Sequence, residues 1–254
     1  FDILKFAIEK ALGITLKAQL WGDKKAAVFL SHDIDKVDSG WLEGGYSEFR
    51  KGKWLSAVKL AIAKLSGQDT WFNLEEIVEL EKKHNAVSTF YFLTNKGKYL
   101  GVLNADYDIK NSKIQNVIQR IKTAGWEVGV HGSYGSAFEK EKLGEEIKKL
   151  SVRVKSNRFH FLSWEQKLTP NILQESKIDY DTTLGFSEHF GFRNGICHPF
   201  HLFDIEKNTP LDVIEIPLNL MDTTFQQKQY LDFPKNEIIS VFTRLLYEVQ
   251  QFDG

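Results

Sequence analysis

Short apolar runs alternate along the chain with longer segments whose hydrophobic positions have helical spacing. Runs rich in β-branched and aromatic residues predict buried strands at 25–35, 87–94, 126–131, 158–162 and 213–221. Helical spacing predicts helices at 1–20, 54–65, 74–84, 112–124, 138–154, 169–176 and 234–252. Because strands and helices alternate, this order predicts an α/β fold with a parallel sheet, either open or closed into a barrel.

Two regions stand apart from the main α/β pattern. We interpret residues 1–24 as an N-terminal helix or the tail of a preceding region, and residues 25–254 as one domain. Within that domain the segment 36–70, rich in Gly, Ser and Lys, is interpreted as an insertion. Helix starts are indicated by Asn73 with Glu76, which resembles a capping box, and by Thr169 as an N-cap before Pro170.

Composition and charge narrow the class of protein. A chain of 254 residues with 42% hydrophobic and 26% charged residues is typical of one large globular domain, not of a disordered or fibrous chain. The net charge of −1 provides no general attraction for nucleic acid, and no apolar run has the roughly 18 residues that a membrane span needs. The single cysteine, Cys197, excludes an internal disulfide. We expect a cytoplasmic location because the chain shows no signal peptide, and its start at Phe1 indicates a piece of a longer protein.

Polar side chains gather where three of the predicted strands end. Asp33 and Asp35 close the first strand, and because they alternate by two, both carboxylates face the same side. Two such carboxylates repel each other unless a cation lies between them. His131 could supply a neutral nitrogen ligand of the kind that zinc accepts, and Arg158 could hold the free carboxylate. The alternative is structural: Asp-x-Asp is common in turns and caps, and single histidines often only bond the backbone.

The order of the motifs SHDID, STFYFL, EVGVHGSY, RFHF, IDYDTTLGF and IEIPL resembles the polysaccharide deacetylase family, as a divergent member. The likeness covers roughly residues 26–222. It implies a distorted (β/α) barrel of the NodB type with one divalent metal ion. By matching motifs, it implies that Asp33 is the catalytic base, that Asp35 and His131 bind the metal, and that Arg158 positions the base.

The sequence departs from the family pattern at two places. Gly135 stands where a second metal-binding histidine is usual, and the third motif reads Arg158-Phe159-His160 instead of Arg-x-Pro. A histidine two residues after Arg158 could face the same side and supply the missing nitrogen. The expected metal ligands are therefore Asp35, His131 and His160, with zinc favoured by two nitrogens and one carboxylate.

The histidine that serves as general acid in the family's last motif is not visible. The final helix is followed by Asp253 and Gly254, so we expect the domain to be C-terminally incomplete, with this histidine beyond residue 254. Within the chain, His198 and His201 are the substitutes. Three other histidines are interpreted as structural: His32, His84 and His189.

The resemblance implies a metal-dependent hydrolase that removes an N-acetyl group from an amino sugar in a polysaccharide or glycolipid precursor. The N–H of Tyr134 or of a neighbour would stabilise the oxyanion. The aromatic side chains expected to stack on sugar rings are Trp41, Tyr46 and Trp164.

Two other classes of function stay open. In a haloacid-dehalogenase-type phosphatase, Asp33 would be the nucleophile and Asp35 the acid, but His131 and Arg158 would then have no role. A non-catalytic carbohydrate-binding barrel is the second alternative, and it is favoured by the absence of the second family histidine.

Overall fold

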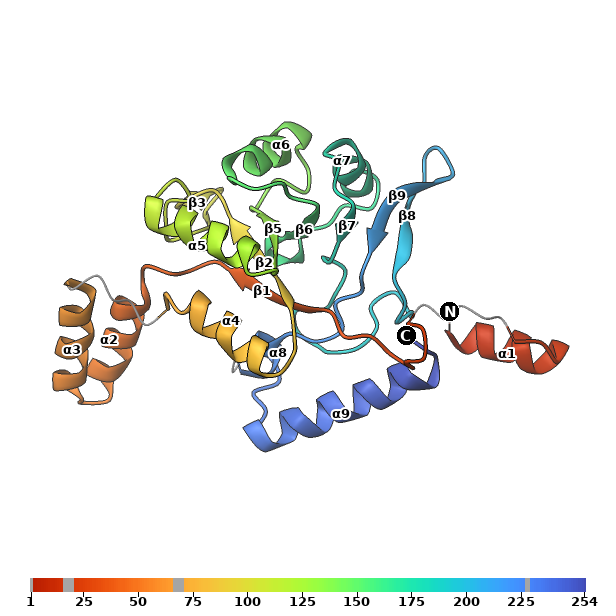
Figure 1. Ribbon diagram of the computed structural model, residues 1–254, viewed down its shortest axis with the longest axis horizontal. Helices are drawn as coiled ribbons and strands as arrows, with labels where there is room; N and C mark the ends of the chain where they lie inside the picture. The colour runs from red at the N-terminus through yellow and green to blue at the C-terminus, as the bar shows by residue number, and fades with distance from the viewer. Residues whose placement is uncertain (1, 16–20, 66–70, 227–228) are drawn as a thin grey trace.

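The computed structural model describes residues 2–15, 21–65, 71–226 and 229–254, and within them a seven-stranded sheet is flanked by helices (Figure 1). In sheet order the strands are β1 (Leu30–Ile34), β2 (Ser88–Leu93), β5 (Glu127–Gly132), β6 (Ser156–Phe159), β7 (Tyr180–Asp181), β9 (Thr209–Glu215) and β8 (Phe200–Asp204). All neighbours are parallel except β8 and β9, which are antiparallel. The predicted α/β class with a mostly parallel sheet is confirmed.

The sheet curves without closing. Its two edges are β1 and β8, and helix α9 (Lys235–Gln251) runs along the open side between them (Figure 1). After α9, the carbonyl of Gly254 accepts a hydrogen bond from Ala27 N, just before β1. The described strands therefore form an open version of the expected barrel, and its last strand, β8, is antiparallel to β9.

Helices pack on the sheet through apolar stripes. They are α4 (Leu74–Lys83), α5 (Ser112–Thr123), α6 (Lys140–Lys149) and α7 (Thr169–Glu175). Helices α5 and α6 contact β5, and α7 contacts β8 and β9. The buried side chains of α5, with the spacing of one helix face, are Ile114, Val117, Ile118 and Ile121. All six residues of β2 are buried, which explains why this strand reads as a continuous apolar run.

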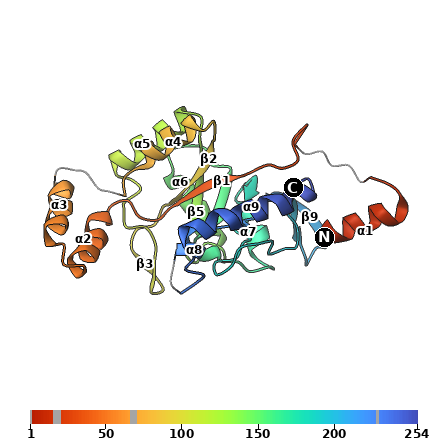
Figure 2. The ribbon, with the colours of Figure 1, turned by 90° about the horizontal axis from the view of Figure 1, so that it is seen from below.

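Three helices extend from the ends of the molecule. Helix α1 (Asp2–Leu12) lies at one end, and α2 (Gly40–Arg50) and α3 (Trp54–Leu65) pack against each other at the opposite end (Figures 1 and 2). The predicted insertion thus contains a helical hairpin, while residues 16–20 and 66–70 of the predicted segments lie outside the described ranges. No helix in the described ranges is both long and apolar enough to span a membrane.

Several predicted strand and helix boundaries are wrong. The strand predicted at 158–162 ends at Phe159, because Phe161 and Leu162 have φ angles of 57° and 51° and form a 3-10 turn. The strand predicted at 213–221 is β9, which ends at Glu215. Helix α6 is shorter than the predicted 138–154. Elements that were not predicted are β7, β8, helices α2 and α8 (Asp222–Gln226), and the hairpin of β3 (Lys98–Tyr99) and β4 (Val102–Leu103).

The two predicted N-terminal caps are also wrong. The side chain of Asn73 makes no capping hydrogen bond. Leu168 is the N-cap of α7, and the Thr169 hydroxyl donates instead to the carbonyl of Ala137. Asn111 does cap α5, because its side chain accepts a hydrogen bond from Lys113 N.

Candidate metal centre and base

The carboxyl ends of three parallel strands bring the predicted site residues together. Asp33 and Asp35 lie at the end of β1, His131 lies near the end of β5, and Arg158 lies in β6. His131 and Arg158 are register partners, and His160 follows in the turn after β6. All five residues line one cleft of about 1070 Å³. The candidate site residues thus lie at the carboxyl edge of the sheet, where the fold class predicted them.

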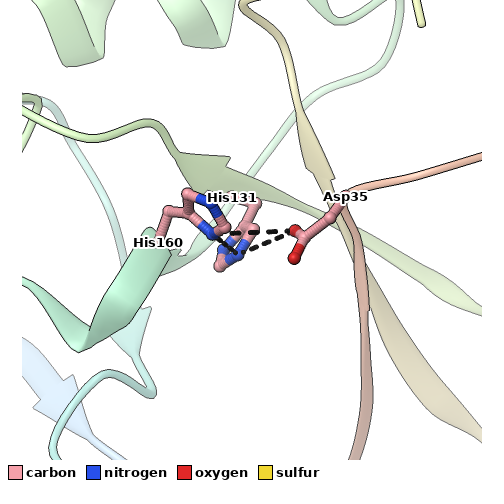
Figure 3. A group of neighbouring side chains, drawn as sticks. All are labelled: Asp35, His131 and His160. Atoms are coloured by element: carbon pink, nitrogen blue, oxygen red, sulfur yellow. Dashed lines mark hydrogen bonds and ion pairs between the residues drawn. The ribbon is translucent and has the colours of Figure 1, made fainter. Parts of the chain in front are cut away.

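Three potential metal ligands converge in this cleft (Figure 3). Asp35 Oδ1 lies 3.3 Å from His131 Nε2 and 3.7 Å from His160 Nδ1. The two histidine nitrogens lie 3.2 Å apart. Bonds of about 2.0–2.2 Å at tetrahedral angles place ligand atoms about 3.3–3.6 Å apart, so these separations fit a zinc-sized ion.

In His131 and His160, the ring nitrogen that points away from Asp35 lies at hydrogen-bonding distance from a backbone carbonyl. His131 Nδ1 lies 2.6 Å from the carbonyl of Arg158, and His160 Nε2 lies 3.1 Å from the carbonyl of Leu103. A carbonyl only accepts, so these two nitrogens carry the hydrogens. In the neutral rings, the inward nitrogens therefore present lone pairs to each other. Asp35 Oδ1 is buried beside them and accepts no hydrogen bond of good geometry, which is the donor arrangement of a cation site.

The charged groups of the cluster shift one another's pKa values. Burial alone would lower the pKa of His131, but the carboxylates of Asp33 and Asp35 outweigh it and raise that pKa. Burial and the neighbouring His131 lower the pKa of His160. Burial would raise the pKa of Asp35, but its close interaction with His131 outweighs burial and lowers it. The surroundings therefore favour a proton on His131 and disfavour one on His160.

Asp33 is held by Arg158 instead of joining the three ligands. Arg158 Nη1 donates to Asp33 Oδ1 at 2.9 Å, and its Nη2 donates to the hydroxyl of Ser31. The guanidinium is 3% exposed and also donates through Nε to the carbonyl and hydroxyl oxygens of Thr182. The other carboxylate oxygen, Asp33 Oδ2, lies 4.0 Å from His131 Nε2. The geometry thus gives the two aspartates different surroundings.

Gly135, at the family's second histidine position, has a backbone conformation and surroundings that leave no room for a side chain. Its φ is 96°, a value that residues other than glycine rarely adopt. A Cβ atom there would lie 2.6 Å from Lys142 Nζ and 2.8 Å from the ring of Tyr99. The lysine lies over that ring and donates to the carbonyl of Tyr134, so the space is filled.

The loop after β5 engages two of the N–H groups that were expected as oxyanion donors. Tyr134 N donates to Asn104 Oδ1, and Ser133 N donates to Glu146 Oε2. Both N–H groups are therefore engaged inside the protein. Glu146 also accepts from both serine hydroxyls of the loop, those of Ser133 and Ser136, and this buried carboxyl fixes the segment that follows His131.

The substitute general acids and the expected sugar-stacking residues lie elsewhere. Neither His198 nor His201 is among the residues that line the cleft, and His201 is exposed on edge strand β8. Trp41 and Tyr46 line a separate cavity of about 280 Å³ on the α2–α3 hairpin. Trp164 packs against the core. None of these five residues lines the cleft, because sequence position does not show which loops return to it.

Two aromatic residues of the cleft were missed in the sequence. Trp71 lines the cleft near Lys36, and Phe161 lines it while remaining 64% exposed. Phe161 directly follows His160, which was the one signal that could have found it. The histidines interpreted as structural contact protein groups: His32 bonds Glu81, His84 ends α4, and His189 lies against the ring of Phe186.

Comparisons with known proteins identify the fold. Neither a protein-family model nor a curated protein matches the chain. A protein from Mycobacterium smegmatis that is assigned as a polysaccharide deacetylase aligns over 92% of this chain and 76% of its own, with TM-score 0.54 and 16% identity. Two other structures align less well. IcaB from Ammonifex degensii aligns over 44% of this chain and 55% of its own, with TM-score 0.32 and 13% identity. A CE4 family pseudoenzyme from Bacillus anthracis aligns over 92% of this chain and 69% of its own, with TM-score 0.36 and 11% identity. The first alignment shows that the chain has the polysaccharide deacetylase fold, as the resemblance implied.

Proposed function

We propose that the protein is a metal-dependent hydrolase that removes an N-acetyl group, or another N-acyl group, from an amino sugar in a polysaccharide or glycolipid precursor. One observation carries the proposal: a carboxylate held by a buried arginine lies beside three convergent metal-ligand atoms in a single cleft. The fold supports the same class of reaction.

The proposed metal ligands are Asp35, His131 and His160, and zinc is the ion that their donor set favours. Three protein ligands leave a fourth position open, which is typical of catalytic rather than structural zinc sites. At this position zinc would supply Lewis acidity toward a bound water molecule and the amide carbonyl. The carbonyls of Arg158 and Leu103 orient the two rings so that the correct nitrogens face inward.

Asp33 is the proposed general base. Its Oδ1 is fixed by Arg158, which leaves Oδ2 directed toward the cluster to take the proton of the attacking water. Because Arg158 is buried and makes four hydrogen bonds, the base is held by a rigid partner. Such positioning matters since a misplacement of about 1 Å can cost about 10²-fold in rate.

The substrate side of the cleft suits a carbohydrate. Trp71 and Phe161 present aromatic surface to the cleft on which the apolar face of a sugar ring can stack. Lys36, Asn219 and Asp222 line the same cleft and offer polar partners for hydroxyl groups. We therefore propose a carbohydrate as the partner molecule of this cleft.

The deciding experiment measures acetate release from a panel of chitooligosaccharides and acetylated sugars, with bound zinc assayed in each variant. Asp33→Asn should keep zinc and lower the rate by about 10²–10⁴, the usual worth of a positioned base. Asp35→Asn should lose both zinc and activity. The matched control is Asp23→Asn, an exposed aspartate outside the cleft, which should change neither.

Other outcomes favour the alternative functions. Zinc binding without acetate release from any member of the panel would favour the non-catalytic carbohydrate-binding barrel. Hydrolysis of phosphate esters, together with beryllofluoride binding that Asp33→Asn abolishes, would favour the phosphatase. Either result would overturn the deacetylase proposal.

A further inference from the structure

Two acidic side chains are buried together on the strands that follow β6, near the arginine that holds the proposed base. Asp181 ends β7 and Glu215 ends β9, and the two residues are register partners on parallel strands. Both are 0% exposed, and each carboxyl group shifts the pKa of the other. They belong to the motifs IDYDTTLGF and IEIPL, to which the proposed reaction assigns no role. Two carboxylates this close cannot both stay ionised at low cost.

Counting hydrogen-bond donors indicates where a proton resides. Asp181 accepts from Asn157 Nδ2 at 2.6 Å and from Thr183 N at 2.9 Å, so both of its oxygens have donors. Glu215 Oε1 accepts from Leu184 N at 2.8 Å. Glu215 Oε2 is buried and has no donor among the described residues. A proton on that oxygen, donated to Asp181, satisfies both groups.

We propose that Asp181 and Glu215 share one proton, held on Glu215, and that the resulting singly charged pair positions Arg158. Arg158 and Tyr91 are ionisable groups that interact electrostatically with the pair. Burial and the charge of Asp181 raise the pKa of Glu215 well above its usual value, which agrees with the hydrogen-bond count.

The pair reaches Arg158 by two routes. Asp181 binds Asn157, the residue before Arg158, and directly precedes Thr182, which accepts from Arg158 Nε. The negative charge of Asp181 also favours the buried guanidinium, together with that of Asp33. The shared proton is independent of the proposed function, whereas the consequence for the base rests on it.

The shared proton is tested by urea unfolding of the whole chain between about pH 5.5 and 7.5. Glu215→Gln mimics the protonated acid, since its amide can donate to Asp181 and accept from Leu184 N. Unfolding of wild type releases the shared proton, so its unfolding constant should rise tenfold per pH unit relative to the variant. Glu188→Gln, an exposed control, should show a constant ratio to wild type. A constant ratio for Glu215→Gln as well would overturn the shared proton.

A spectroscopic measurement covers the case in which Glu215→Gln does not fold. The infrared spectrum of wild type at neutral pH should contain the carbonyl band of a buried protonated carboxyl group. This band should persist when the pH of the solution is changed around neutrality. Absence of this band would refute the proposal without any variant.

The positioning role has its own readouts. Asp181→Asn should lower kcat by up to about 10²-fold at nearly unchanged KM, because the pair does not touch substrate, while Glu215→Gln should retain kcat. In a double-mutant cycle, Asp181→Asn and Arg158→Gln should be non-additive by at least about twofold in the unfolding constant. Additive effects would overturn positioning even if wild type released no acetate, so this failure is distinguishable from failure of the proposed function.

Discussion

Removal of the His160 imidazole tests the proposed metal centre most sharply, because this residue is the proposed substitute for a ligand that the family pattern places elsewhere. In wild type, three ligand atoms converge within 4.8 Å of one another. His160→Ala leaves only Asp35 and His131. We expect zinc to stabilise the wild-type fold and this gain to disappear in the variant. The comparison uses the gain and not the absolute stability, because His160 is buried and its truncation also removes packing.

The expected gain in stability follows from the zinc concentration relative to Kd, because the site geometry needs little adjustment. Ligand separations of 3.2, 3.3 and 3.7 Å are close to the tetrahedral values, so binding needs little rearrangement of the folded state. Zinc at 100 times its Kd then stabilises the fold by about 2.7 kcal/mol. For a chain of this length each kcal/mol raises Tm by about 2–4 °C, which gives about 5–11 °C. A 100-fold loss of affinity in His160→Ala leaves about 0.4 kcal/mol, or about 1–2 °C.

The assay is thermal unfolding of chelator-treated protein with and without zinc, alongside elemental analysis. His201→Ala is the matched control, because His201 is an exposed histidine on β8. Its ring bonds the backbone carbonyl of Leu211, and it does not line the cleft. It should keep the full gain, as should Asp33→Asn. A full gain in His160→Ala would show that this residue is not a ligand. A wild-type protein that gains nothing from zinc or another divalent ion would refute the metal centre.

Three further predictions concern the base, the packing of the sheet and pH. Arg158→Lys should lower kcat by about 10-fold or more with zinc still bound, because a single ammonium cannot replace a fork that binds several partners; steady-state kinetics with metal analysis test this. Gly129→Ala should cost about 1–3 kcal/mol in urea unfolding, because its Cβ would lie 2.4 Å from the Tyr91 ring, whereas Gly144→Ala, with open space in helix α6, should gain up to about 1 kcal/mol; equal effects would contradict the overlap. Zinc affinity should fall by up to about tenfold per pH unit in mildly acid solution, because the raised pKa of His131 means that zinc must displace a proton; calorimetric affinities that do not change with pH would contradict this assignment.

The strands that carry the site were predictable because their local patterns are strong. The run before Asp33 and Asp35, the buried strand β2 and the strand that ends at His131 each combine β-branched or aromatic residues with a polar end. Alternation with helices then implied a parallel sheet, in which carboxyl ends share one edge. The candidate ligands and base could therefore be named from the sequence together with the family resemblance.

The weaker strands could not be predicted, because their residues are stabilised by distant partners. Strand β7 has two residues, Tyr180 and Asp181, and forms only because β6 and β9 lie on either side of it. The same applies to the buried pair of Asp181 and Glu215, which are 34 positions apart in sequence by their numbering and adjacent in the sheet. Hydrophobic periodicity is a local property and contains no information on register between strands.

The fold class and the chemical types of the site residues could be inferred from the sequence, because both depend on spacings of a few residues. Which of these residues meet depends on the tertiary structure. His160 reaches the ligands because the chain turns sharply after Phe159 instead of continuing as a strand. His198 and His201, which the sequence offered as substitutes for the general acid, are not among the residues that line the cleft. The physical reason is that a metal or acid–base site requires separations of about 3 Å, and such distances are set by strand register and loop packing over the whole sheet.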